Sequence, residues 1–104
     1  MKLPIKDRRI LKKIQDLCRF PERVIFTRRA QIDIAELSAT STDVLDAIKD
    51  HIDKGKDVHF LIQRETQLVA YTMIIPISCT ACYVKVQIDT NHAGEILIVI
   101  SCHP

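Results

Sequence analysis

The sequence predicts an α+β domain in which N-terminal helices pack on a four-stranded antiparallel sheet. Apolar residues recur with a helical period up to about residue 52, whereas from Asp57 onward they alternate or run together in β-branched stretches. Helical segments precede the strands instead of alternating with them, which is the order of an α+β domain. The long apolar runs after residue 67 further predict strands that are buried on both faces.

Length and composition indicate a single domain of 104 residues, with 47% hydrophobic and 27% charged residues. No apolar run reaches the roughly 18 residues that a membrane span needs. The N-terminus has no apolar segment of the secretory type, so no leader is expected. Four cysteines are too few and too unevenly spread for a disulfide scaffold. We therefore expect a cytoplasmic protein with no membrane association.

The net charge of +2 hides an asymmetry along the chain. Residues 1–30 contain ten Lys and Arg against three acidic residues, whereas residues 31–104 contain five against ten. This division is typical of a basic face for a polyanion or of a docking surface for an acidic partner. An ordinary solvated helix face explains it equally well.

The first predicted helix spans residues 5–18, with Pro4 in its first turn, where a missing N–H costs nothing. One apolar stripe follows the helical period, and it consists of Ile10, Leu11, Ile14, Leu17 and Cys18. The opposite side is basic and carries Arg8, Arg9, Lys12 and Lys13. Pro21 ends the helix. Residues 1–21 thus form a basic amphipathic helix that precedes a core at residues 22–104.

The second predicted helix begins at Thr27, a suitable N-cap, and continues to about Leu37. Arg28 and Arg29 would occupy its first turn. The helix dipole disfavours cations there, and such a local conflict sometimes marks a functional position.

The third predicted helix has the clearest start, because Thr40 and Asp43 form a capping pattern of the Ser/Thr-x-x-acid type. Its buried stripe consists of Val44, Leu45, Ile48 and Ile52. The helix is expected to end at Lys54-Gly55-Lys56, where basic residues and a glycine suit a C-terminus.

Four strands complete the prediction. An outer strand with one wetter face covers residues 58–63, where His59 alternates with apolar neighbours, and a turn at 64–66 follows. Pro76 ends or bends the second strand, since proline cannot donate to a ladder. Gly94 is available for a positive φ in the last hairpin loop, at 90–94. The second to fourth strands cover 68–75, 83–89 and 95–102.

Three segments resemble the RelE superfamily, in particular an uncharacterised RelE-like family and the MqsR messenger-RNA interferases. The segment F-T-R-R-A at 26–30 is similar to the F-T-x-H/R-A opening of these domains. T-S-T-D-V-L-D-A-I at 40–48 is similar to their next helix. Y-V-K-V-Q-I-D at 83–89 and E-I-L-I-V-I-S-C-H-P at 95–104 resemble the end of their apolar meander. The resemblance covers residues 22–104 and implies a RelE-like fold.

The resemblance also implies a function, that of the toxin in a type II toxin–antitoxin system. Such a toxin is an endoribonuclease that cleaves messenger RNA, free or on the ribosome, without a metal or other cofactor. Its partners would be RNA and a cognate antitoxin protein, and the sequence leaves open whether the chain forms a homodimer. The chemistry needs one group to deprotonate the 2′-hydroxyl, another to protonate the leaving oxygen, and cations to hold the phosphate.

Matched position by position, the resemblance implies a set of site residues. Tyr83 and Lys85 match a tyrosine and a lysine of the MqsR meander. His103 falls at the position where the last strand of the family supplies a basic residue, and His59 falls near the position of a lysine in the family's first strand. Histidine suits proton transfer because its ordinary pKa is near 6.5. We expect His59, Tyr83 and His103 to be catalytic. RNA phosphates would contact Lys85 and the N-terminal cations Arg8, Arg9, Lys12, Lys13, Arg28 and Arg29.

The cysteines leave three interpretations open. Cys79 and Cys82 form a C-x-x-C, and Cys102 and His103 complete a set of four with the ligand types of zinc. The same thiols can instead be small buried hydrophobes, or a redox-active pair. The alternative to a nuclease is therefore a non-catalytic RelE-like module that binds nucleic acid or protein, with or without stabilisation by zinc.

Overall fold

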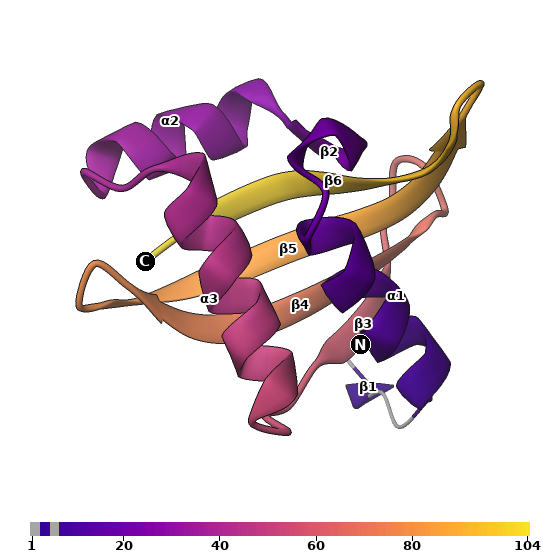
Figure 1. Ribbon diagram of the computed structural model, residues 1–104, viewed down its shortest axis with the longest axis horizontal. Coiled ribbons are helices and arrows are strands. Elements are labelled where there is room, and N and C mark those ends of the chain that lie inside the picture. Colours follow the sequence, from indigo (N-terminus) through magenta and orange to yellow (C-terminus); the bar gives the residue numbers. More distant parts are fainter. Residues whose placement is uncertain (1–2, 5–6) are drawn as a thin grey trace.

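The computed structural model describes residues 3–4 and 7–104, with side chains from residue 7 onward. It has a six-stranded sheet with three α-helices packed on one face (Figure 1). The strand order is β1-β3-β4-β5-β6-β2, and all neighbours are antiparallel except β2 and β6. The predicted α+β class is confirmed, and the four predicted antiparallel strands form the middle of a larger, mixed sheet.

Each α-helix begins at a side-chain cap. Asp7 caps α1, Thr27 caps α2, and Thr40 forms a complete capping box with Asp43 at the start of α3. The predicted N-caps of the second and third helices are therefore confirmed. The helical elements are α1 (Arg8–Cys18), the short 3-10 helix η1 (Pro21–Arg23), α2 (Arg28–Glu36) and α3 (Ser41–Asp53).

The predicted start of the first helix is wrong. Pro4 lies in a two-residue strand, β1 (Leu3–Pro4), which pairs with β3 (His59–Ile62). The helix begins at Arg8 because the Asp7 carboxylate accepts a hydrogen bond from the Arg9 backbone N–H. The other predicted helical positions, residues 5 and 6, lie outside the described residues. The strand predicted to be outermost, β3, consequently has a neighbour on its outer side.

The second, third and fourth predicted strands are longer than expected because the hairpins that join them are tight. Ser78 and Cys79 form a two-residue turn with φ of 51° and 63°, the backbone of a type I′ turn. Pro76 does not end its strand, since β4 lies at the sheet edge beyond Thr72 and tolerates a missing N–H there. The strands are β2 (Val24–Phe26), β4 (Val69–Ile77), β5 (Thr80–Asn91) and β6 (Gly94–His103).

The hydrophobic core lies between the helices and one face of the sheet. All three helices contribute to it, together with alternate residues of β4, β5 and β6. The opposite face has no helix over it among the described residues (Figure 1). We call it the open face, and its residues include His59, Thr72, Ile74, Tyr83, Lys85, Gln87, Ile96, Ile98, Ser101 and His103. The prediction that the strands are buried on both faces holds only in part, because no helix covers the open face although Thr72, Gln87, Ile96 and Ser101 on it are buried.

A β-bulge decides which side chains of β6 reach the open face. Lys85 pairs with Ser101 and Val86 with Val99, so that Ile100 is the extra residue. Leu97 and Val99 point into the core. Strict alternation from these two residues would also point His103 into the core, whereas the bulge turns it to the open face.

A buried carboxylate on α2 pairs with the edge of β6 beyond the end of β2. Asp33 is only 1% exposed, and its Oδ2 accepts the Cys102 backbone N–H at 3.0 Å. Its Oδ1 lies 3.1 Å from Nε of Arg29. Strand β2 pairs with residues 97–99 and ends before this point. The Asp33 side chain thus accepts the hydrogen bond that a further residue of β2 would otherwise accept.

We expect Asp33→Ala to lower the free energy of unfolding by about 1–3 kcal/mol, because the Cys102 N–H would stay buried without an acceptor. Asp33→Asn should cost less, since an amide oxygen can still accept that bond. Urea unfolding of the two variants measures the difference. Equal stability of Asp33→Ala and the unsubstituted protein would show that this hydrogen bond contributes nothing.

Candidate functional site

The strand register brings the predicted site residues of three strands onto the open face in two neighbouring rows. In the first row His59 pairs with Thr72, Thr72 with Lys85, and Lys85 with Ser101. In the second row Ile74 pairs with Tyr83, and Tyr83 with His103. Residues that alternate with these positions, such as Val84 and Cys102, lie in the core. Residues 44 positions apart in the sequence thus share one surface.

Tyr83 and His103 are in contact. Their ring centroids lie 5.5 Å apart with planes inclined by 35°. The His103 imidazole Nδ1 lies 3.1 Å from the Pro104 carbonyl oxygen. Lys85 is two residues from Tyr83 on the same strand and face, and it has no acidic partner among the described residues. An aromatic hydroxyl, an imidazole and an unpaired ammonium group therefore lie together.

His59 approaches the same tyrosine from the other side. It lies on β3, three strand spacings or about 14 Å of backbone from β6. His59 and Tyr83 both line a pocket of about 440 Å³, together with Thr72 and Ile74. The two histidines therefore flank Tyr83 and Lys85 and do not touch each other.

The sequence did not point to the other wall of this pocket. His51, Lys56 and Asp57 line it from the end of α3 and the segment that leads into β3. The buried His51 imidazole Nε2 lies 2.8 Å from the Asp57 carbonyl oxygen, which ties the last helical turn to this segment. A histidine on the apolar stripe of a helix was the available signal, since His51 follows Val44 and Ile48 at helical spacing.

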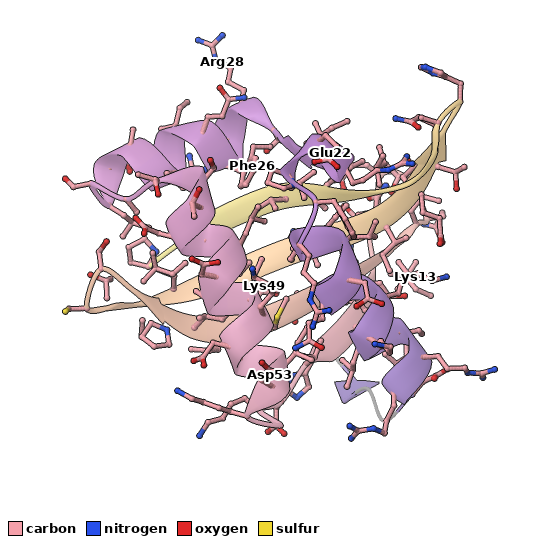
Figure 2. All side chains as sticks on the ribbon, in the orientation of Figure 1. Lys13, Glu22, Phe26, Arg28, Lys49 and Asp53 are labelled. Carbon is pink, nitrogen blue, oxygen red and sulfur yellow. The ribbon has the colours of Figure 1, made fainter. Side chains whose placement is uncertain are left out.

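The predicted phosphate-binding cations lie on the other side of the molecule. Helices α1 and α2 carry all of them except Lys85, and both helices cover the core face of the sheet (Figure 1). Arg28 projects from the start of α2, far from Lys13 on α1 (Figure 2). The structure therefore does not bring Arg8, Arg9, Lys12, Lys13, Arg28 and Arg29 onto the surface that holds His59, Tyr83 and His103.

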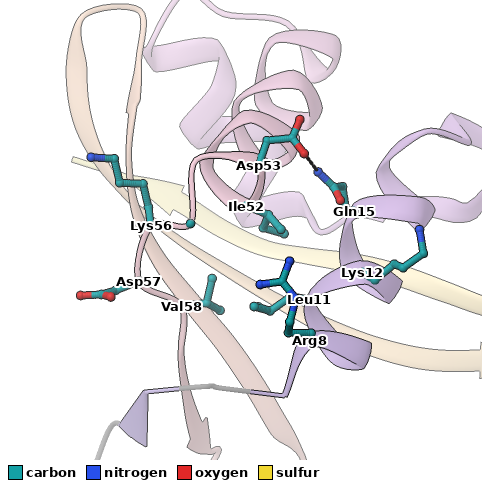
Figure 3. A pocket seen from close by; sticks show the side chains of 10 residues that line it. Arg8, Leu11, Lys12, Gln15, Ile52, Asp53, Lys56, Asp57 and Val58 are labelled. Atoms are coloured by element: carbon teal, nitrogen blue, oxygen red, sulfur yellow. Dashed lines mark hydrogen bonds between the residues drawn. The ribbon is translucent and has the colours of Figure 1, made fainter.

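A second pocket, of about 470 Å³, separates α1 from the end of α3. Figure 3 shows Arg8 pointing into it between α1 and Val58, while Gln15 reaches across to the Asp53 carboxylate. The side chains around this pocket carry both signs of charge, since Lys12 and Lys56 join Arg8 and oppose two aspartates. The mixed charge gives this pocket no strong preference for an anion.

The cysteines and His103 do not form one cluster. Cys82 and Cys102 are buried in the core, Cys79 is exposed at the hairpin turn, and His103 lies on the opposite face from Cys102. No group of three or more metal-ligating side chains comes together within the described residues. Burial raises the pKa of the Cys102 thiol to about 11, and it also raises the pKa of Cys82. Both thiols are therefore protonated at neutral pH, as expected of small buried hydrophobes.

No helix in the described ranges is long and apolar enough to cross a membrane. No family model, curated protein or solved structure matches the chain significantly.

Proposed function

We propose that the chain is a RelE-like toxin that cleaves messenger RNA without a metal, and that the open face is its active site. The observation that carries this proposal is the register that gathers His59, Tyr83, Lys85 and His103 on one uncovered surface. These are the residues to which the resemblance assigns proton transfer and phosphate binding. The resemblance itself supports the proposed RelE-like fold.

The arrangement suits attack of a 2′-hydroxyl on the adjacent phosphate. Such a reaction needs a base at the attacking oxygen and an acid at the leaving oxygen, on opposite sides of the phosphorus. A phosphate above Tyr83 and Lys85 would have His59 on one side and His103 on the other. The Lys85 ammonium group would stabilise the negative charge that builds up on the phosphate oxygens.

The open face also suits a protein inhibitor. Ile74 and Ile25 are exposed apolar residues on this face, and Ile74 lies beside Tyr83 in the sheet. A cognate antitoxin that covers them would bury apolar area and would block the proposed active site at the same time. A cytoplasmic location follows from the proposed substrate.

The test is incubation of the purified protein with mixed messenger RNA in the presence of EDTA, with cleavage read by primer extension. We expect discrete cuts that disappear in His59→Ala and His103→Ala. His92→Ala is the matched control, because His92 lies at the tip of the β5–β6 hairpin, outside the two rows. A reaction with added ribosomes and an induced-expression growth assay cover a ribosome-dependent toxin. Absence of cuts in both reactions, together with normal growth at confirmed expression, would contradict the proposal.

A non-catalytic binding module is the second candidate. The separation of the α1 and α2 cations from the open face favours it, because one short RNA segment cannot contact both layers at once. Retained RNA binding without any cleavage would support the module over the nuclease.

A further inference from the structure

A third pocket lies along the outer side of α1 and has both positive charge and an exposed aromatic ring. Its volume is about 450 Å³. We call it the α1 groove, and its walls are formed by Arg9, Lys12, Lys13, Asp16, Leu17, Phe20, Arg23 and Glu95. Four of these residues are cations and two are carboxylates. The groove belongs to the helical layer, on the opposite side of the sheet from the open face.

Phe20 is the one exposed Phe or Tyr side chain in the part of the chain that the structure describes, with 53% of its surface accessible. The backbone holds it at a rigid corner between α1 and η1. Its N–H donates to the Leu17 carbonyl at 3.1 Å, and its own carbonyl accepts the Arg23 N–H at 2.7 Å. Pro21 follows it directly. The ring is therefore presented to solvent at a fixed place, with little conformational entropy left to lose on binding.

The cations of the groove are held in place but remain accessible. The Arg23 guanidinium donates to the Ala93 carbonyl at 2.7 Å, a bond that leaves its charge uncompensated. Lys13 pairs with Glu95 at 2.9 Å across the groove, and Asp16 lies 3.7 Å from the Lys12 ammonium group. These exposed pairs are weak, and they exchange readily for a phosphate.

We infer that the α1 groove binds single-stranded nucleic acid, with phosphates on the cations of α1 and a base stacked on Phe20. Nonspecific single-strand sites combine a basic track with aromatic platforms in this way. Arg9 and Cys18 are nine positions apart, or about 14 Å along α1, and Phe20 lies just beyond the end of this helix, a span that accommodates a few nucleotides. This inference is independent of the proposed nuclease activity, because it concerns the opposite layer of the molecule.

An acidic protein segment fits the groove less well. A docking peptide helix uses several apolar anchors at helical spacing. The groove offers one ring and Leu17, with cations on both sides. A stacking platform needs only one such ring, because every base has a flat face.

The test uses fluorescein-labelled oligodeoxythymidine of about 12 nucleotides, the full chain, and fluorescence anisotropy at several salt concentrations. This probe lacks the 2′-hydroxyl, so that the proposed cleavage chemistry cannot consume it. We expect Phe20→Ala to weaken binding about tenfold and Phe20→Trp to preserve it. Lys12→Gln should lower the slope of log affinity against log salt by about 0.7.

Two control variants match these changes away from the groove. Lys54 also pairs with an aspartate one helical turn away, at the end of α3, so Lys54→Gln removes the same charge elsewhere. Ile62 is a comparably exposed apolar residue on β3, which makes Ile62→Ala the control for Phe20→Ala. Both controls should bind the probe as the unsubstituted protein does, and circular dichroism should show all variants folded.

The inference is overturned if the probe does not bind at low salt, or if the Phe20 and Ile62 variants bind it equally well. It is also overturned if polyglutamate binds more tightly than the probe with the same dependence on Phe20 and Lys12, because the groove would then serve an acidic protein. Each of these results leaves the proposed cleavage at the open face undecided. Failure of cleavage, in turn, does not affect binding to the α1 groove.

Discussion

If the chain is the proposed ribonuclease, replacement of His103 with alanine is expected to reduce the rate of RNA cleavage by a factor of about 10²–10⁴, the usual contribution of a general acid or base. His103 is half-buried on the open face, and its ring contacts Tyr83. The substitution removes no residue of the hydrophobic core, so the fold should be retained. Cleavage of messenger RNA under single-turnover conditions measures the loss, and relief of growth arrest in an expressing host provides a second readout.

Two further variants distinguish a direct role of His103 in proton transfer from an indirect role in positioning the Tyr83 ring. Tyr83→Phe retains the ring that packs on His103 and removes only the hydroxyl. A large loss in both variants would show that hydroxyl and imidazole act on the same substrate. His92→Ala should cleave at the rate of the unsubstituted protein. If His103→Ala also cleaves at that rate, His103 does not belong to the active site, and Tyr83 with His59 must carry the proton transfers.

The fold could be predicted where local signals were strong and where tertiary contacts agreed with them. The Thr40–Asp43 capping box and the change of apolar period near Asp57 are both local, and both led to the correct elements. Strands β1 and β2 have two and three residues, too few for a period to appear in the sequence. They exist because β3 and β6 offer them unpaired edges, and such pairing partners cannot be seen locally.

The placement of the site depended on features that a sequence pattern does not contain. His59, Tyr83 and Lys85 follow the simple alternation of their strands and so reach one face. His103 joins them only because of the bulge at Ile100. No residue type in that segment predicts a bulge. The basic helix was predicted correctly as amphipathic, but its apolar stripe turns it toward the core face, away from the candidate catalytic residues.

Replacement of Ile48 with alanine is expected to lower the free energy of unfolding by about 2–5 kcal/mol, through lost burial and the cavity that remains. Ile48 is completely buried in the middle of α3, a helix that packs on both α1 and β4. A domain of this size has about 5–15 kcal/mol of stability in total, so this is a substantial part of it. Each kcal/mol corresponds to about 4–8 °C in Tm, which thermal unfolding followed by circular dichroism measures.

Two further substitutions provide reference values for the loss of stability in Ile48→Ala. Ile48→Val removes one methylene group and should cost about 0.5–1.5 kcal/mol. Ile32 lies on an exposed side of α2, so Ile32→Ala should change the free energy of unfolding by less than about 0.5 kcal/mol. If Ile48→Ala proved as stable as Ile32→Ala, the packing of α3 against the sheet would be wrong. His51, in the last turn of α3, holds the Asp57 segment that lines the pocket beside His59. The proposed RNA cleavage should therefore weaken in Ile48→Ala on warming, before the whole domain unfolds.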